Sequence, residues 1–335
     1  MAIQFNCVSS MLILVLLSIS SVEGQGGGGG GVIDVVAKFG SKADEKRDLT
    51  TLDGPCKAPI ELQVEGTVKA LANPGAFKEP KWITFNRIEN FKLFGGGLFD
   101  GQGTTAYKRE GCKNHDYCGS LPIPKHRWDS HRGSDGVNVL NSEIKTGDDC
   151  VSIGDGSKNL VINGVTCGPG HGISIGSLGL FKNEEPFDGV TVKNCSFTNT
   201  SNGVRIKTWP GAERGICSNI HFEDITVTNV SSPIIIDQKY CPWNKCKINE
   251  ESKVKLSNIS FKNIHGTSAL PEAVKIICSA TLPCENVELA DIEITHSGPT
   301  GPAVSQCSNV KPKVSGKQNP APCSAPLPAK PTPTT

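Results

Sequence analysis

Side chains that could do chemistry occur in a fixed order in the middle of this chain. Two adjacent acids come first, Asp148 and Asp149, in the run Thr-Gly-Asp-Asp-Cys. Neighbouring ionised carboxylates repel each other, so a structured segment seldom carries such a pair without a use for it. The other candidates follow in this order: His171, Arg205, Lys207 and Tyr240.

An acid pair, an imidazole, two cations and a phenol suit hydrolysis of a glycosidic bond beside an anionic sugar. One carboxyl group would protonate the leaving oxygen and the other would activate water. The two cations would bind the carboxylate of the sugar through charge-assisted hydrogen bonds. Taken alone, each has an ordinary structural explanation: a solvated turn for the acids, a turn residue for the histidine, a solvated strand face for the cations and packing for the tyrosine. Their common order favours catalysis.

The acid pair also makes a demand on the backbone. Acid and base in an inverting glycosidase stand roughly 6.5–9.5 Å apart with water between them. Neighbouring residues of a strand project to opposite faces, so Asp148 and Asp149 can reach one sugar only where the chain bends. Gly147 permits such a bend.

A repeat of strand-like segments surrounds these residues. Alternating apolar segments begin near residues 137, 160, 190, 220, 254 and 287, so that successive starts are separated by 23, 30, 30, 34 and 33 residues. A second short strand follows each of the first five in the same phase. Helical periodicity is absent, and the density of Gly, Asn and β-branched residues disfavours helices.

Strands repeated at this period predict an all-β, parallel β-solenoid in a single domain, each unit forming one coil stacked on the last. A β-sandwich of antiparallel hairpins is the main alternative, but it would need two-residue turns, which are few here. In the solenoid, equivalent positions lie about 4.8 Å apart per coil. The polar motifs would therefore form a ladder that contacts consecutive sugars.

Composition and local sequence predict where the protein is sent and where its segments begin and end. A net charge of +1 argues against a nucleic-acid partner. Residues 1–24 are expected to be a signal peptide, with a short apolar core and small residues for cleavage, although the segment before that core lacks a basic side chain. An N-terminal anchor or a buried helix is the alternative. Residues 25–31 would be a glycine-rich spacer, 32–319 the β-helix domain and 320–335 a proline-rich tail.

Cysteine usage agrees with secretion. Thirteen cysteines remain beyond the expected signal peptide, many of them closely spaced, and no Cys-x-x-Cys pair suggests zinc. Disulfides are therefore expected, with at least one thiol left free, and Cys56 has no obvious neighbour. Four glycosylation sequons begin at Asn194, Asn199, Asn229 and Asn258.

The motifs, taken in order, resemble those of plant polygalacturonases, and most closely the pollen-type exopolygalacturonases. The similarity covers most of residues 32–323 and is carried by these runs: 54–59 (GPCKAP), 94–103 (FGGGLFDGQG), 147–150 (GDDC), 167–172 (CGPGHG), 205–207 (RIK) and 240–243 (YCPW). Such enzymes are right-handed parallel β-helices that hydrolyse α-1,4-galacturonosyl links with inversion and without a metal or other cofactor.

The resemblance also implies roles for individual residues. Asp148 would be the general acid, Asp149 a base that activates water, and His171 a group that tunes the pair. Arg205 and Lys207 would bind the galacturonate carboxylate. Tyr240, together with Gly172, would belong to the substrate site, with the tyrosine on the leaving-group side.

Two departures from the family pattern stand out. Family members carry a third acid in an Asn-Thr-Asp-Gly motif about one coil before the acid pair, and that motif is missing here. Asp129, 19 residues before Asp148, is the candidate third acid by register, although its neighbours do not match. Relative to the family, the chain is expected to carry deletions near 50–53 and 125–136. Loss of a coil would be expected to break the stacking and leave a solenoid edge unpaired.

The sequence thus predicts a secreted, monomeric polygalacturonase of the cell wall, which acts on pectin, is not held by a membrane after signal cleavage and works in the exo mode. Two alternatives stay open. A relative that binds pectin without cutting it would follow from loss of the third acid. A pectate lyase would need calcium and would release an unsaturated product.

Overall fold

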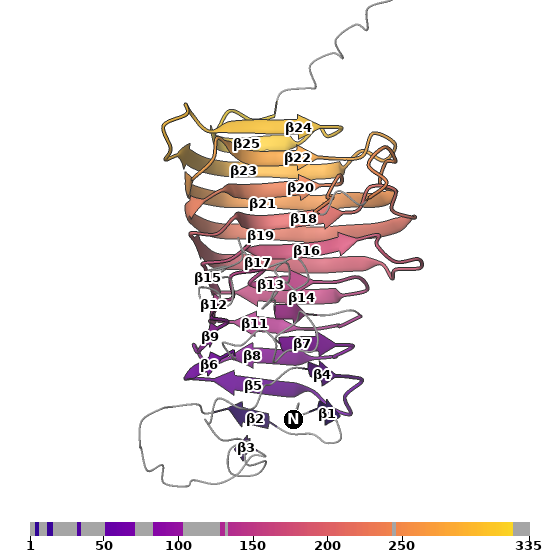
Figure 1. Ribbon diagram of the computed structural model, residues 1–335, viewed down its shortest axis with the longest axis vertical. Helices are drawn as coiled ribbons and strands as arrows, with labels where there is room; N and C mark the ends of the chain where they lie inside the picture. Colours follow the sequence, from indigo (N-terminus) through magenta and orange to yellow (C-terminus); the bar gives the residue numbers. More distant parts are fainter. Residues whose placement is uncertain are drawn as a thin grey trace, which may run out of the picture.

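The computed structural model describes residues 53–70, 83–102, 133–242 and 246–323 in full, and the backbone alone of 4–6, 12–15, 32–34, 51–52 and 128–130. Every strand pair in this part of the chain is parallel, and the strands are stacked as the rungs of one tall column (Figure 1). This pattern is a parallel β-helix, as the repeat predicted. Connections between parallel strands of one sheet are right-handed. The β-sandwich alternative is wrong. Among the described residues no helix has the length and hydropathy to cross a membrane.

Two sheets make up the column. Sheet A has ten strands, in this order: β1 (Gln4–Asn6), β4 (Thr51–Asp53), β7 (Ile83–Asn86), β10 (Trp128–Ser130), β13 (Val151–Ile153), β16 (Ile173–Leu178), β18 (Asn202–Thr208), β20 (Ser232–Asp237), β22 (Glu272–Ile277) and β24 (Val304–Ser308). Sheet A carries the candidate site.

Sheet B forms the remaining walls. Its main path runs through β25 (Lys313–Asn319), β23 (Glu285–His296), β21 (Val254–Ser268), β19 (Gly215–Val230), β17 (Phe187–Thr198), β14 (Lys158–Asn163), β11 (Asn138–Leu140), β8 (Phe91–Phe94), β5 (Ile60–Val64), β2 (Leu12–Val15) and β3 (Val32–Asp34). A side branch holds β6 (Thr67–Lys69), β9 (Leu98–Asp100), β12 (Glu143–Lys145) and β15 (Thr166–Cys167).

The core fills the inside of the column in register. Val190, Ile220, Ile259 and Val287 occupy one register position on four successive coils, and none is more than 1% exposed. Burial of such aliphatic side chains contributes roughly 1.5–3 kcal/mol each. The alternation in the sequence therefore exists because every second side chain enters this continuous core.

Asparagines form ladders at two bends of sheet B. At one bend Asn194 donates its side-chain amide to Asn163, and at the other Asn258 donates to Asn219 and accepts from Asn286. Asn194 (φ 52°), Asn219, Asn258 and Asn286 adopt a positive φ, which Asn tolerates better than other non-glycine residues. At these bends the side chain that allows the turn also bonds a neighbouring coil.

The predicted gap in the stack does not occur. In sheet A, β10 pairs with β7 on one side and β13 on the other, and in sheet B β11 joins β8 to β14. A strand of three residues is enough to continue a parallel ladder. The strands in the shortened region, β10 and β11, are short, but both remain paired with the strands on either side.

The expected signal peptide holds two strands. β1 pairs with β4, and β2 pairs with β5 and β3. Cleavage after residue 24 would remove β1 and β2 and make β4 and β5 the first rungs. The proline-rich tail lies mostly outside the described residues, and β25 ends at Asn319, the predicted end of the domain.

Disulfides form between four of the closely spaced pairs: Cys150–Cys167, Cys241–Cys246, Cys278–Cys284 and Cys307–Cys323. Cys112 and Cys118 lie outside the described residues. Cys56, which had no obvious partner in the sequence, is disulfide-bonded. The free thiols in the described part of the chain are Cys195 and Cys217, both buried on sheet B, where burial raises the pKa of Cys195 to about 12. A protonated thiol in this core behaves as a small apolar side chain.

Candidate active site

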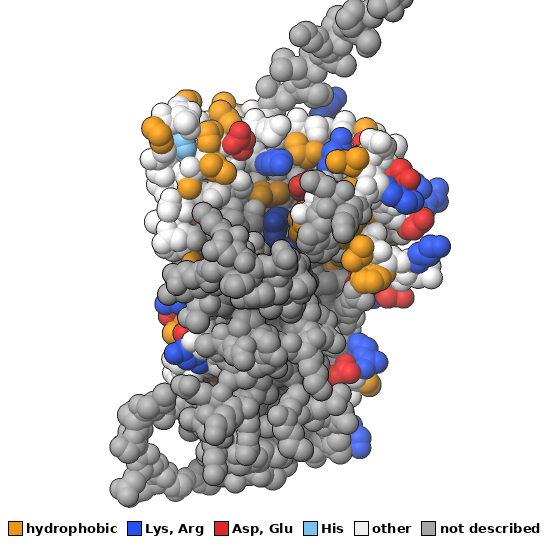
Figure 2. Space-filling view, in the orientation of Figure 1, with side chains coloured by type: hydrophobic (Ala, Val, Ile, Leu, Met, Phe, Trp, Pro, Cys, Tyr) orange, Lys and Arg blue, Asp and Glu red, His pale blue; other side chains and the backbone are white. Residues whose placement is uncertain are grey.

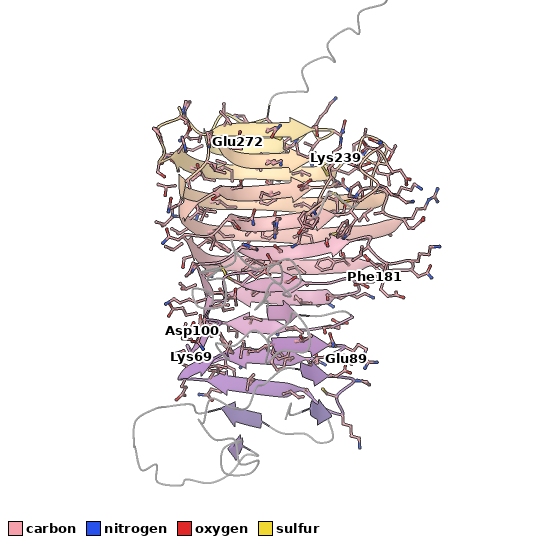
Figure 3. The ribbon with its side chains drawn as sticks, in the orientation of Figure 1. Lys69, Glu89, Asp100, Phe181, Lys239 and Glu272 are labelled. Carbon is pink, nitrogen blue, oxygen red and sulfur yellow. A yellow bond between two sulfur atoms is a disulfide. The ribbon has the colours of Figure 1, made fainter. Side chains whose placement is uncertain are left out.

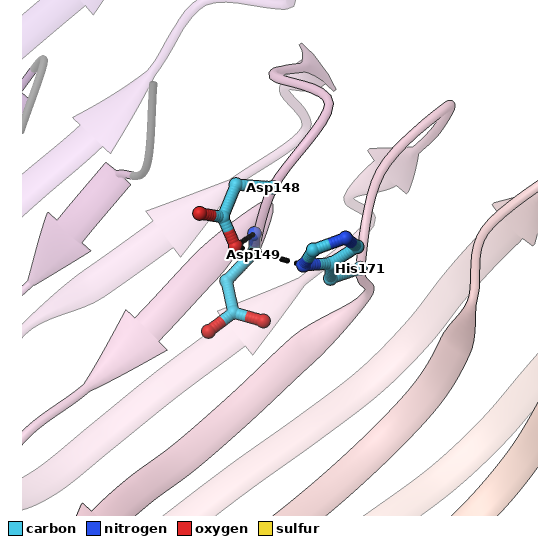
Figure 4. A group of neighbouring side chains, drawn as sticks. All are labelled: Asp148, Asp149 and His171. Atoms are coloured by element: carbon cyan, nitrogen blue, oxygen red, sulfur yellow. Dashed lines mark hydrogen bonds and ion pairs between the residues drawn. The ribbon is translucent and has the colours of Figure 1, made fainter. Parts of the chain in front are cut away.

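A sharp bend precedes β13 and carries the acid pair. Gly147 has φ of +80°, and the Thr146 hydroxyl donates to the carbonyl of Asp148 over 2.9 Å. The His171 backbone N–H donates to the same carbonyl over 2.7 Å, and the Cys150–Cys167 disulfide follows at once. The bend expected from Gly147 is therefore present, and it brings both carboxyl groups to one side of the chain (Figure 4).

Asp148 is bonded to His171. Its Oδ1 lies 2.9 Å from His171 Nδ1 and accepts the backbone N–H of Asp149 over 2.8 Å (Figure 4). Burial raises the pKa of Asp148, but the hydrogen bond from His171 and the other favourable contacts outweigh burial and the charge of Asp149, so the pKa lies below its ordinary value of 3.8. In this arrangement Asp148 is a carboxylate rather than a ready proton donor.

Asp149 is held by two cations and a hydroxyl. Its Oδ1 accepts from Ser174 Oγ (2.9 Å) and Arg205 Nη2 (2.9 Å), and its Oδ2 accepts from Lys207 Nζ (3.0 Å). Asp149 is only 1% exposed, and the side chain of Lys207 only 4%. Opposite charges at this distance in a buried site favour the ionised carboxylate. Arg205 and Lys207 therefore meet Asp149 here, where the resemblance had placed them against a substrate carboxylate.

Tyr240 closes the other side of this cation pair. Its ring centre lies 5.2 Å from Lys207 Nζ and 5.7 Å from the guanidinium carbon of Arg205, within the range of cation–π contacts. Trp209 packs edge-on against Tyr240 and donates its indole N–H to Ser177 over 2.8 Å. The phenol predicted for the site is thus beside the cations.

Gly172 has a backbone role. Its carbonyl accepts from Cys150 N over 2.7 Å, and it adopts a φ of +82°. A Cβ there would lie 2.2 Å from the carbonyl oxygens of Asn202 and Gly203, so the close approach of two coils requires glycine. Contact between Gly172 and a substrate stays a prediction.

The acid pair and the imidazole form one close group. Single ligand atoms of Asp148, Asp149 and His171 all lie within 4.8 Å of one another. The same three residues could in principle hold a metal ion, but Arg205 and Lys207 occupy both oxygens of Asp149 and would repel a cation.

Asp129, the candidate third acid, lies in sheet A on the strand that pairs with β13. The backbone register pairs Asp129 of β10 with Ser152 of β13, which pairs with Ser174 of β16. Ser174 contacts Asp149 from the coil after β13. Asp129 holds the same register position on the coil before it.

Sequence reasoning missed two residues of the site. Ser174 links Asp149 to Arg205, since its hydroxyl also accepts from Arg205 Nε over 3.1 Å. Trp209 supports Tyr240 from behind. A serine inside a strand does not by itself predict a contact with a catalytic acid. The one sequence signal for Ser174 is its position three residues after His171.

Over β18 and β20 the space-filling view shows a hollow with Lys or Arg atoms at its floor (Figure 2). The loops that follow sheet A strands lie on one flank of the column, marked by Phe181 and Lys239 in Figure 3. The acid pair, imidazole and cations come from β13, β16 and β18 or the turns that precede them, so a long ligand could cross them coil by coil. This fold and this site define a solenoid glycoside hydrolase.

Comparison with known proteins gives the family. The family model "Glycosyl hydrolases family 28" matches residues 31–125 and 128–319. A polygalacturonase of Gossypium hirsutum is 52% identical and aligns over all of both chains, and an exopolygalacturonase of Oenothera organensis is 49% identical over 82% of this chain and 89% of that protein. The chain belongs to glycosyl hydrolases family 28.

Solved structures agree on the fold. Endo-xylogalacturonan hydrolase from Aspergillus tubingensis superposes with a TM-score of 0.54 at 19% identity and covers 81% of this chain and 90% of that one. Polygalacturonase from Erwinia carotovora gives 0.50 at 20% identity, over 79% and 87%. The alignment with the Gossypium hirsutum protein runs over 412 positions against 335 residues here, so that relative has segments without a counterpart in this chain.

Proposed function

We propose that this protein is a secreted polygalacturonase of the cell wall that hydrolyses α-1,4-D-galacturonosyl links of pectin as a monomer. The observation that carries the proposal is the assembly of Asp148, Asp149, His171, Arg205 and Lys207, from three successive coils, into one bonded cluster. Acid pair and cations in contact suit cleavage beside an anionic sugar. The relatives named exopolygalacturonase favour attack from the chain end.

Asp148 is assigned the general acid and Asp149 the base that holds water. Protonation of Asp148 requires its bond to His171 to loosen, and we propose that substrate entry displaces the imidazole, of which 44% is exposed. Asp149 stays ionised beside its cations and is a weak base for that reason. Inversion is what the resemblance implies, and the anomer released first, observed by proton NMR, distinguishes inversion from retention.

Asp129 is the candidate to stand in for the missing third acid. Its register position mirrors that of Ser174 across β13, and Ser174 reaches Asp149 from its own coil. A carboxylate at the mirrored position would help Asp149 to hold the attacking water.

The test uses Asp148→Asn and Asp149→Asn on polygalacturonate with a chelator present. Each change should lower the release of reducing ends by roughly 10²–10⁴-fold, because a carboxamide has the size of the acid but cannot exchange the proton. Glu223→Gln on sheet B is the matched control and should leave the rate unchanged. Turnover at the wild-type rate in either aspartate variant would remove the acid pair from the mechanism.

One sequence observation favours a second candidate, a pectin-binding protein that does not cut. The Asn-Thr-Asp-Gly motif is missing, and Asp149 is neutralised by its own cations. Binding of galacturonate oligomers without any release of reducing ends would select this alternative. Calcium dependence with an ultraviolet-absorbing product would select a pectate lyase.

A further inference from the structure

The buried carboxamide of Gln238 lies directly after β20, two residues before Tyr240. Only 1% of Gln238 is exposed. Its Nε2 donates to the carbonyl of Val254 over 2.9 Å and, in a longer contact of 3.5 Å, to the hydroxyl of Thr208, while its Oε1 accepts the backbone N–H of Ser279 over 2.9 Å. A shift of this side chain would leave buried polar groups unpaired, which is costly. Gln238 is therefore a fixed point of the structure.

These bonds close the base of the loop that carries Tyr240. The loop joins β20 to β21, so that Gln238 is its first residue and Val254, the first residue of β21, follows its last. The bond between them holds the two ends of the loop together. The hydroxyl of Thr208, at the end of β18, also lies 2.7 Å from that of Ser252 in the same loop. The base of the loop is thus bonded to β18, the strand that carries the two cations of the site.

The next coil holds the same point from the other side. The backbone N–H of Gln238 donates to the carbonyl of Ile277, at the end of β22, over 2.9 Å. Ser279, which donates to the carboxamide, lies inside the loop closed by the Cys278–Cys284 disulfide. Gln238 is therefore bonded both to the coil before it and to the coil after it.

Tyr240 has weaker contacts of its own. Its ring centre lies 5.2 Å from Lys207 Nζ, 5.7 Å from the guanidinium carbon of Arg205 and 5.8 Å from the ring of Trp209. Ring contacts of this kind are individually weak. Because only two residues separate the ring from Gln238, a shift at the base of the loop would carry the phenol away from the cations.

We propose that Gln238 is a positioning residue that holds the phenol of Tyr240 beside the two cations, where it meets the substrate on the leaving-group side. The role of Tyr240 toward the substrate rests on the proposed function. Loss of Gln238 should raise KM and leave kcat nearly unchanged, because the bonds to the acid pair come from His171, from β16 and from β18.

Fluorine NMR measures the position of Tyr240 without any ligand. The chain has three tyrosines, so protein labelled with 3-fluorotyrosine gives three resonances, and Tyr240→Phe identifies the one of interest. Gln238→Met has a side chain of similar length that cannot make these hydrogen bonds, and it should shift or broaden this resonance. An unmoved resonance in the folded variant would overturn the proposal.

Two further variants complete this measurement. Gln318→Met is the matched control, because Gln318 on β25 also donates to backbone carbonyls, among them that of Ser315 over 2.8 Å, and it should leave the resonance unchanged. Where Gln238→Met does not fold, Gln238→Glu replaces it. An ionised carboxylate keeps the oxygen that accepts from Ser279 but cannot donate to Val254, so the resonance should again move.

Kinetics and a double variant test whether Gln238 acts through the ring. With galacturonate oligomers, Gln238→Met should raise KM by about threefold to tenfold, as expected for one lost contact. Added to Tyr240→Ala, it should change KM by less than about twofold, because both changes remove the same contact. Effects on KM that multiply would overturn the proposal. Absence of hydrolysis by the unmodified protein would instead overturn the proposed function, and the NMR result would still decide the placement of Tyr240.

Discussion

Asp148 and Asp149 are neighbours in sequence but meet different partners, and this difference separates their roles. Asp148 is bonded to a single exposed imidazole and to the N–H of Asp149, whereas Asp149 lies against two cations and a serine. A group whose partner can move away can change its protonation state during a reaction. A group enclosed by cations enters the reaction as the ionised carboxylate, the form that can accept a proton from water. The acid and base assignments follow from this contrast.

His171 controls the protonation of Asp148. His171→Ala leaves burial and the charge of Asp149, which raise the pKa of Asp148, and removes the two His171 contacts that lower it, so that only the backbone N–H of Asp149 still lowers it. The pKa of Asp148 should therefore rise, and the limb of the profile of kcat/KM against pH that reports this group should shift to higher pH. A limb that does not move would separate His171 from the acid.

The same lowered pKa affects stability. Because the folded pKa of Asp148 lies below the unfolded value, its contribution is complete well above pH 3.8 and is lost as the pH falls through the folded pKa. Asp148→Asn should lose this part of the unfolding free energy, so the difference between wild type and variant should shrink in acid. Urea unfolding at several pH values would measure it.

Lys207 offers a test of the buried ion pair. Lys207→Ala should lower the free energy of unfolding by about 3 kcal/mol or more, because Asp149 is almost fully buried and loses a partner at 3.0 Å. It should also weaken binding of galacturonate oligomers and reduce the effect of salt on that binding. Lys239→Ala breaks an exposed pair at 3.6 Å and should change stability by less than about 1 kcal/mol. Equal effects in the two variants would contradict a buried role for Lys207.

At the scale of the elements, the Cys150–Cys167 disulfide ties the acid-bearing turn to β15. Replacing both cysteines by Ala should lower the free energy of unfolding by about 3 kcal/mol for this loop of 17 residues. The same change at Cys278 and Cys284, six residues apart, should cost about 2 kcal/mol. Chemical denaturation measures both. Only the first should also reduce activity, because only the first bond adjoins Asp149.

The sequence predicted the strands better than it predicted which side chains contact one another in the site. Alternation and period predicted the strands around Val190, Ile220 and Val287, because each coil must fill the same core. Partners of Asp149 come from residues 25, 56 and 58 positions later. No local pattern says that Lys207 would turn toward an acid rather than a ligand. The continuous pairing through β10 was also missed, since a strand of three residues leaves almost no pattern.

For the whole molecule, the shortened region decides how active the enzyme is. The stack continues through β10, so the loss affects chemistry more than folding. We expect activity below that of a complete family member by roughly 10²–10⁴-fold, the usual contribution of general-base assistance. Insertion of an Asn-Thr-Asp-Gly coil ahead of Val137 should restore it, as measured by reducing-end release. If this chain is fully active without the insertion, Asp129→Asn should abolish that activity.

The hydrogen bonds of two asparagines, one in an asparagine ladder and one in sheet A, bear on how this protein ages chemically. An Asn followed by Gly is the pair most prone to deamidation, and Asn163–Gly164 and Asn202–Gly203 are of this kind. Asn163 accepts from Asn194, so an Asp at 163 would keep the bond, now to a charged acceptor. Asn202 instead donates to the carbonyl of His171, a bond that Asp could not make. Asn202 borders the active site. Its position in β18, where it is 8% exposed, shields it from slow hydrolysis.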